Sequence, residues 1–131
     1  MANHRVNLTQ HNALPEQGCI EPSEETQKEV RNLITFNEIP SDEEMRTRAV
    51  RIAEIASESG ADSAMIGGAG YFQRYLEEEL LARGIEPVYA FSKRESVEAV
   101  QEDGSVKKTF VFRHAGFVRP YSSLTHQKSK D

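Results

Sequence analysis

The sequence predicts a single α/β domain in which a mostly parallel sheet carries helices on both faces, with a β-hairpin at the C-terminal side. Two observations favour this fold class. Residues 63–92 read, in order, as a strand, a helix and a strand, which is the pattern of a βαβ unit with parallel strands. Residues 96–114 read as two strand-like runs around Asp103-Gly104, a dipeptide typical of a hairpin turn.

The composition indicates one soluble domain. The chain has 131 residues, of which 37% are hydrophobic and 28% charged, and this is enough for one core. We expect the domain to cover residues 1–120, with a flexible tail over residues 121–131. The net charge of −5 argues against a protein that binds duplex DNA, because such proteins need a basic face.

The sequence gives no indication of a membrane protein. No apolar stretch approaches the roughly 20 residues that span a bilayer. Residues 1–11 lack the apolar core of a signal peptide, and Cys19 is the only cysteine, so no disulfide can form within the chain. We therefore expect a cytoplasmic protein with no membrane partner.

The first half of the chain predicts one strand and two helices. Residues 4–11 alternate apolar and polar side chains, as a short strand does. After a connector with two prolines, a helix is expected to start near Ser23. Ser41 and Glu44 then form the sequence pattern of a capping box, which begins a second helix that Gly60 ends.

The second half predicts the βαβ unit and the hairpin. Residues 63–69 form a buried strand that runs into glycines, residues 71–83 a helix that stops at Gly84, and residues 86–92 another strand. The hairpin is expected to follow as a separate element. The predicted core consists of Val6, Leu8, Leu33, Ile52, Ile66, Phe72, Leu76, Leu80, Val88 and Phe91.

Polar or glycine-rich segments follow three of the predicted strands. In a parallel sheet with helical crossovers, ligands bind beyond the carboxyl ends of the strands, so we expect these segments to meet at one edge. They consist of Thr9, Gln10 and His11 after the first strand, Gly67, Gly68, Ala69 and Gly70 after the second, and Ser92, Lys93, Arg94 and Glu95 after the third.

The glycine segment suits an anion such as phosphate. Glycine lets a ligand approach the backbone closely, and the helix that follows points its free N–H groups and positive dipole end at the turn. Tyr71 or Phe72, both in the first helical turn, could stack on a base. Lys93 and Arg94 could neutralise the charge. The segment matches neither the phosphate-loop nor the dinucleotide-binding pattern. The alternative is that these glycines only make a tight turn.

His11 is the candidate for acid–base chemistry, because imidazoles titrate near neutral pH. Thr9 or Gln10 beside it could orient a phosphate or a hydroxyl. The alternative is a solvated histidine in a turn, and we interpret Arg113 and His114 as a polar strand end. The four histidines show no metal-ligand spacing, so we expect no metal and no cofactor.

Three segments carry a resemblance to a known protein family: "NLTQHNALPEQ", "MIGGAGYFQRYLEEELLARG" and "PVYAFSKRES". Across residues 5–96 the pattern resembles small CRISPR-associated proteins related to the sensor domains that bind cyclic oligoadenylate. Some of these proteins are similar to ring nucleases, which open that cyclic RNA messenger. The resemblance implies a Rossmann-like three-layer domain and a homodimer with the ligand across its two-fold axis.

The resemblance also implies a reaction and its residues. In such proteins a ribose 2′-hydroxyl attacks the adjacent phosphate without a metal ion, while the protein holds the two in line. By position, His11 would transfer the proton, and Lys93 or Arg94 would stabilise charge. The ligand-binding residues would be Thr9, Gln10, Gly67, Gly68, Ala69, Gly70, Tyr71 and Ser92.

The expected function is therefore binding of cyclic oligoadenylate, with cleavage that limits a CRISPR-type defence signal. Two alternatives stay open. One is a non-catalytic nucleotide-binding protein, and the other is an interaction protein without a small ligand.

Overall fold

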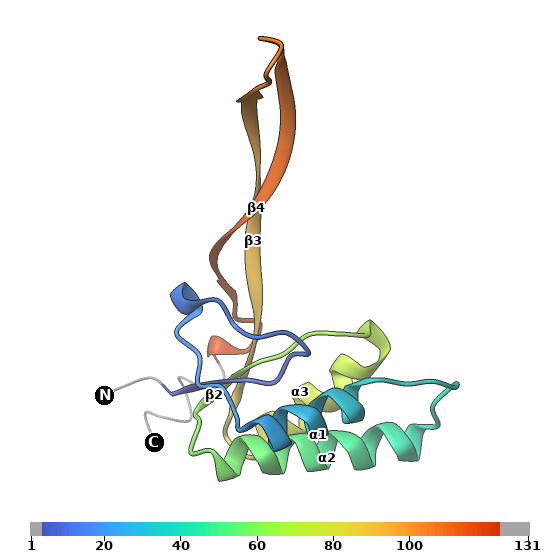
Figure 1. The fold of residues 1–131 in the computed structure, drawn as a ribbon. Coiled ribbons are helices and arrows are strands. Elements are labelled where there is room, and N and C mark those ends of the chain that lie inside the picture. The colour runs from blue at the N-terminus through green and yellow to red at the C-terminus, as the bar shows by residue number, and fades with distance from the viewer. Residues whose placement is uncertain (1–3, 124–131) are drawn as a thin grey trace.

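The computed structural model describes residues 4–123 and shows a small α/β body from which a long two-stranded ribbon protrudes (Figure 1). The elements in chain order are β1 (Arg5–Asn7), the 3-10 helix η1 (Pro15–Gln17), α1 (Glu24–Ile34), α2 (Asp42–Glu58), β2 (Ser63–Met65), α3 (Gly70–Ala82), β3 (Glu86–Val100) and β4 (Val106–Val118). None of the helices in this part of the chain is long and apolar enough to cross a bilayer. Most of the predicted tail, from residue 124 onward, lies outside the described residues.

The four strands form one mixed sheet in the order β1-β2-β3-β4. β1 pairs with β2 and β2 pairs with β3, both in parallel, whereas β3 and β4 run antiparallel. β2 is buried along its whole length, as expected for a strand with a parallel neighbour on each side. The predicted α/β fold, with a mostly parallel sheet and a C-terminal hairpin, is confirmed.

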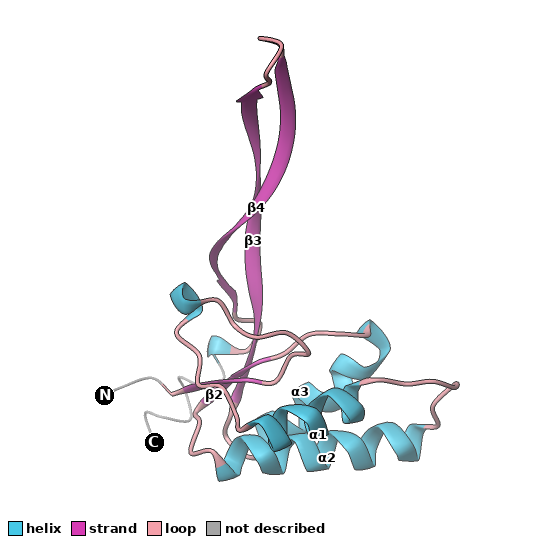
Figure 2. Cartoon of the chain, in the orientation of Figure 1, coloured by secondary structure: helices cyan, strands magenta, loops and turns pink. Residues whose placement is uncertain are grey.

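The helices α1, α2 and α3 all lie on one face of the sheet, and α2 packs on both of the others (Figure 2). The expectation of helices on both faces, and so of a three-layer domain, is wrong. The reason lies in the strand order. Both parallel crossovers step across the sheet in the same direction, and because such crossovers are right-handed, their helices reach the same face.

The core fills the space between this helical layer and the sheet. The predicted core residues are buried except for Leu33, which is partly buried, and Phe91, which is exposed. Phe72 and Leu76 of α3 are among the most completely buried side chains, and burying a side chain of this size stabilises the fold by about 1.5–3 kcal/mol.

The helices α1 and α2 begin where the sequence indicated. Ser23 Oγ accepts a hydrogen bond from the Thr26 amide, and Ser41 Oγ accepts one from the Glu44 amide at 3.0 Å. The expected capping box at Ser41 is only half formed, because the Glu44 carboxylate instead pairs with Arg48 at 2.7 Å. The Ser41 hydroxyl is therefore the side-chain cap of α2.

β3 does not end near Ser92, as the sequence suggested. Residues 86–92 and the run that follows form one continuous strand, of which only the first residues pair with β2. The rest pairs with β4 alone and leads to the turn 101–105. No glycine or proline interrupts residues 88–100, so nothing in the backbone stops the strand while β4 supplies hydrogen bonds. We call residues 92–114 the arm.

The turn at the tip of the arm has the predicted Asp-Gly chemistry. Asp103 Oδ1 accepts hydrogen bonds from the Ser105 amide at 2.9 Å and the Ser105 hydroxyl at 2.6 Å. These two bonds lower the pKa of the Asp103 carboxyl. Gly104 has φ +84°, a backbone conformation that other residues adopt at a cost.

A β-bulge separates the arm from the rest of the sheet. Phe91 pairs with Gly116, but the next residue, Ser92, pairs with His114, so Ala115 is the extra residue of β4. Gly116 has φ +148°. The ribbon therefore changes direction where it leaves the body.

An ion pair fastens the end of β4 to the start of β3. Glu86 is only 6% exposed, and its two carboxylate oxygens accept from Arg119 Nε at 2.8 Å and Arg119 Nη2 at 2.9 Å. This two-point geometry is the strong form of an arginine–carboxylate pair.

Removal of the Arg119 side chain should destabilise the body. Arg119→Ala leaves the buried Glu86 carboxylate without its partner, so the free energy of unfolding in urea should fall by about 2–3 kcal/mol. The matched control is Arg74→Ala, because Arg74 and Glu78 form an ion pair with both side chains exposed, and it should cost less than about 1 kcal/mol. Equal losses in the two variants would contradict this account.

Candidate functional site

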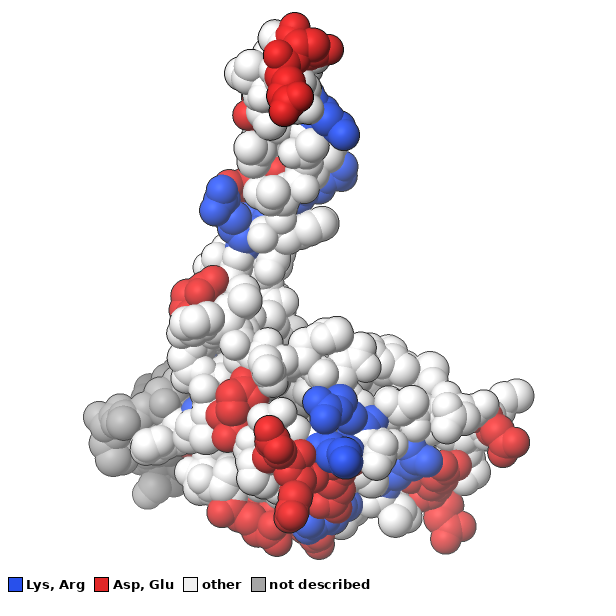
Figure 3. Space-filling model, viewed as in Figure 1, with Lys and Arg blue, Asp and Glu red and all other residues white. Residues whose placement is uncertain are grey.

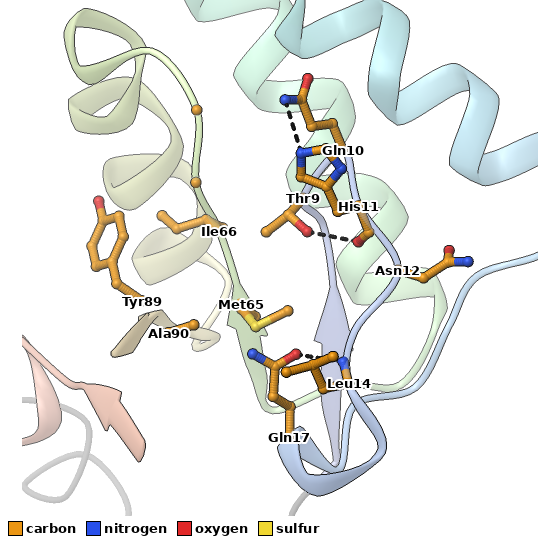
Figure 4. Close-up of a pocket in the computed structure, with 12 residues that line it drawn as sticks. Thr9, Gln10, His11, Asn12, Leu14, Gln17, Met65, Ile66, Tyr89 and Ala90 are labelled. Carbon is orange, nitrogen blue, oxygen red and sulfur yellow. Dashed lines mark hydrogen bonds between the residues drawn. The ribbon is translucent and has the colours of Figure 1, made fainter. Parts of the chain in front are cut away.

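A cavity of about 410 Å³ lies at the carboxyl ends of β1 and β2, beside the part of β3 that directly follows its pairing with β2 (Figure 4). Its walls come from the loop after β1, the glycine turn after β2, and β3. The lining residues are Thr9, Gln10, His11, Asn12, Leu14, Gln17, Met65, Ile66, Gly67, Gly68, Tyr89 and Ala90. The volume is within the range of small-ligand sites. The first two predicted segments therefore meet at this edge of the sheet.

The loop after β1 is held by the buried side chain of Asn7, which is 4% exposed. Its Nδ2 donates to the His11 carbonyl at 2.7 Å and to Glu21 Oε1 at 2.9 Å. Its Oδ1 accepts from the Thr9 amide at 2.9 Å and from the Thr9 hydroxyl at 2.7 Å. One carboxamide thus fixes the backbone on both sides of Gln10.

Glu21 completes this brace from the connector that precedes α1. Its carboxylate accepts from Asn7 and also from the Ala13 amide at 2.7 Å. Sequence reasoning missed both Asn7 and Glu21. An asparagine inside a strand pattern is the signal that could have identified Asn7, because strands disfavour this residue type. Nothing in the sequence pairs it with Glu21.

The glycine turn is held by a buried glutamine that the sequence analysis also missed. Gln73 Nε2 donates to the carbonyls of Gly67 at 3.2 Å and Ala69 at 3.0 Å. Because both partners are acceptors, the orientation of the amide is determined, and Gln73 Oε1 has no hydrogen-bond partner among the described residues. Gly68 has φ +115°, which explains why a glycine stands there.

The turn offers backbone donors. The amides of Gly67, Gly68 and Ala69 donate to no residue of the described chain. α3 begins at Gly70 and directs the positive end of its dipole toward the same turn. This combination of free amides and a helix start suits an anion.

Six predicted site residues lie outside the lining of this cavity, and three of them are at the start of α3. Ala69 and Gly70 form the start of α3 next to it. Tyr71 contacts Phe36, with ring centroids 5.8 Å apart, and borders a different hollow that also includes Ile39. Tyr71 is therefore not positioned to stack on a base bound in the cavity.

Ser92, Lys93 and Arg94 do not form a third loop at this edge, because β3 continues through them into the arm. Ala90 lines the cavity, and strand alternation places Ser92 and Arg94 on the same face of β3 as Ala90, with Lys93 on the opposite face. The Arg94 guanidinium stacks on the Phe110 ring, 3.8 Å from its centroid.

The floor of the cavity is apolar, with Met65, Leu14 and the Tyr89 ring among its parts. The Tyr89 hydroxyl donates to the Glu77 carboxylate, which also accepts from Tyr121 at 2.7 Å. Burial and this hydrogen bond raise the pKa of Tyr89, so its phenol stays neutral. A mixed lining of this kind suits a ligand with one flat apolar group and one polar group.

His11 contributes the only imidazole to the lining, as far as the structure describes the chain, and its Nε2 lies 3.3 Å from Gln10 Nε2. No lysine or arginine is among the lining residues described. Within residues 4–123, no three His, Cys, Asp or Glu side chains are grouped so that they could hold a metal ion.

Comparison with known proteins places the chain in a family. A model of the Uncharacterized protein MJ1673 family matches residues 1–118. The chain belongs to this family. The MJ1673 family match includes both the residues of the cavity and the whole arm. No curated protein and no solved structure matches the chain.

Asn7→Ala should loosen the loop after β1. Several partly buried hydrogen bonds are lost together, so the free energy of unfolding should fall by about 2–3 kcal/mol. Hydrogen exchange at the Thr9 amide should become at least about tenfold faster. The control is Asn12→Ala, an exposed asparagine of the same loop, which should change stability by less than about 0.5 kcal/mol. Unchanged exchange at Thr9 would show that Asn7 does not hold the loop.

Proposed function

We propose that the cavity binds a nucleotide, and that its ligand is a cyclic oligonucleotide such as cyclic oligoadenylate. The observation that carries the proposal is the pairing, across one cavity with an apolar floor, of a polar loop at residues 9–12 with the free amides of residues 67–69. Amides and a helix start suit the phosphate, and the apolar floor suits the base. The family resemblance found in the sequence supports a cyclic oligoadenylate as the ligand.

The cavity has room for one nucleotide unit, so a ring of several units would extend out of its mouth. β3 rises beside that mouth, because Ala90 both lines the cavity and belongs to the strand. Ser92 and Arg94 come next on the same face of β3. We assign both Lys93 and Arg94 to the general electrostatic field around the mouth, because β3 carries them into the arm.

We further propose that His11 assists a metal-independent cleavage. The ribose 2′-oxygen attacks the adjacent phosphorus and gives its proton to His11, and the bond from phosphorus to the 5′-oxygen breaks. The products are a 2′,3′-cyclic phosphate and a 5′-hydroxyl that takes its proton from solvent. The amides of Gly67 and Gly68 would stabilise the charge that develops on the phosphate oxygens.

A nucleotide-binding protein that does not cleave its ligand is the second candidate. The observation that favours it is the lack of a lysine or arginine among the described residues of the lining. Phosphodiester transfer builds up negative charge that cations commonly stabilise. In this case the protein would sequester or sense the nucleotide and release it chemically unchanged.

Labelled cyclic oligoadenylates of three to six units, incubated with the chain in EDTA, distinguish these functions. A linear product on chromatography supports the cleavage. A thermal shift with unchanged ligand supports the binding protein. If micromolar protein shows no binding and forms no product, both proposals are overturned. The remaining alternative is then an interaction protein without a small ligand.

His11→Ala should separate catalysis from binding. Loss of the imidazole should slow turnover by about 100-fold or more, while the Kd for the cyclic substrate changes less than about threefold. His4→Ala is the control, because His4 is exposed and lies outside the cavity. A His11 variant that loses binding and turnover equally would contradict the proposed role.

Gly68→Ala should weaken nucleotide binding at least about tenfold, because φ +115° is strained for alanine and the turn would shift. The control is Gly70→Ala, where an added Cβ meets nothing within 4 Å and alanine favours the helix. It should retain binding. The Kd values should be measured where circular dichroism shows both variants folded, and equal affinities would argue against phosphate binding at the turn.

A further inference from the structure

One face of the arm carries an exposed row of apolar side chains. The register of β3 and β4 brings alternate residues of both strands to this face, which we call face A. Face A consists of Ser92, Arg94, Ser96, Glu98 and Val100 from β3 and of Val106, Lys108, Phe110, Phe112 and His114 from β4. Both valines and both phenylalanines are exposed, and Phe112 is 73% exposed.

The opposite face of the arm is more polar. It carries Lys93 and an ion pair between Glu95 and Arg113 at 2.6 Å, and its Val97 and Val111 are half-buried. Among residues 4–123, no third strand and no helix lies beside the arm where it leaves the body (Figure 1). A two-stranded ribbon in water is only marginally stable by itself, so covering face A would stabilise the arm.

We propose that face A packs against face A of a second copy, with the two arms antiparallel around a two-fold axis at Ser96 and Phe110. This axis brings the two Phe110 rings together. It places Arg94 of each copy opposite Glu98 of the partner subunit. An isologous contact of this kind needs a face that is complementary to itself, and the pair at positions 94 and 98 fulfils this requirement.

The distribution of charge favours antiparallel over parallel arms. Acidic side chains gather at the tip of the arm and basic side chains lie lower on it (Figure 3). The tip carries Glu102 and Asp103, whereas Lys93, Arg94 and Arg113 lie nearer the body. Parallel arms would bring two acidic tips together, but antiparallel arms keep them apart.

The size and shape of the arm also fit this arrangement. Face A extends along β3 from Ser92 to Val100, which is about 26 Å of strand. Its two phenylalanines and two valines are all more than half exposed, so they offer apolar area toward the about 800 Å² per partner of a stable interface. The body spreads out at the base of the arm, so antiparallel arms keep the two bodies at opposite ends (Figure 1).

The inference does not rest on the proposed function, because the apolar residues of face A lie outside the cavity. Sedimentation velocity tests it directly. The chain should sediment at micromolar concentration with twice its mass of 14.8 kDa, and Phe112→Asp should sediment as a monomer. Since Phe112 is exposed, this change removes no core contact.

The matched control is Ile39→Asp, because Ile39 is 98% exposed on the loop between α1 and α2, away from the arm. It should remain dimeric. A monomeric unchanged chain at 100 micromolar, a dimeric Phe112→Asp variant, or a loss of the dimer only in Ile39→Asp would each overturn the proposal.

Cross-linking tests the antiparallel order. In a Cys19→Ser background, Ser96→Cys lies at the proposed axis and should cross-link to its copy with a short bismaleimide. Val100→Cys should not cross-link. Residue 100 lies four positions from the axis in each copy, so the two introduced cysteines would be about 26 Å apart. A cross-link at Val100→Cys, or none at Ser96→Cys, would overturn the arrangement.

Discussion

The right-handedness of parallel crossovers determines the shape of this molecule. Because β1, β2 and β3 follow one another in a single direction across the sheet, the three helices share one face and the other face receives none. Met65 and Val88, paired in register on that other face, are nevertheless buried. The loop after β1 and η1 lie over this side, and the Arg5 guanidinium stacks on the Phe117 ring of β4, 4.2 Å from its centroid. A cavity exists at this edge because loops leave space that a packed helix would have filled.

Buried carboxamides position both walls of the cavity. Asn7 holds the loop after β1, and Gln73 holds the glycine turn. A neutral amide supplies donors and acceptors together and is less costly to bury than a charged group. The described lining therefore has free backbone amides at the glycine turn but no lysine or arginine beside them. A negatively charged ligand would bind to these oriented amide dipoles and to the N-terminus of α3.

The sequence predicted the parts of this fold that local chemistry determines. Helix starts followed from Ser23 and Ser41, the glycine turn from its composition, and the hairpin from Asp103-Gly104. These features depend on neighbours a few residues apart, so their patterns are readable without a structure.

Features that depend on distant partners were missed or misread. β3 continues past Ser92 because β4 lies beside it, and the strand pattern alone could not show that partner. The single helical layer follows from the strand order, which periodicity does not encode. The hydrogen bonds between Asn7 and Glu21 join residues whose pairing has no sequence signature. The prediction was right that the loops after β1 and β2 converge, because both strands end at this edge of the sheet. It was wrong about a third loop, because β3 continues into the arm.

The bulge at Ala115 and Gly116 is the point at which the direction of the arm relative to the body is determined. The ribbon reaches about 30 Å beyond it, so a pivot of about 10° there would swing the tip by about 5 Å. The paired residues of β1 and β2 would keep their places during such a pivot, since the extra residue sits only in β4. The direction of the ribbon is thus set by a local feature of β4, apart from the contacts of the hydrophobic interior.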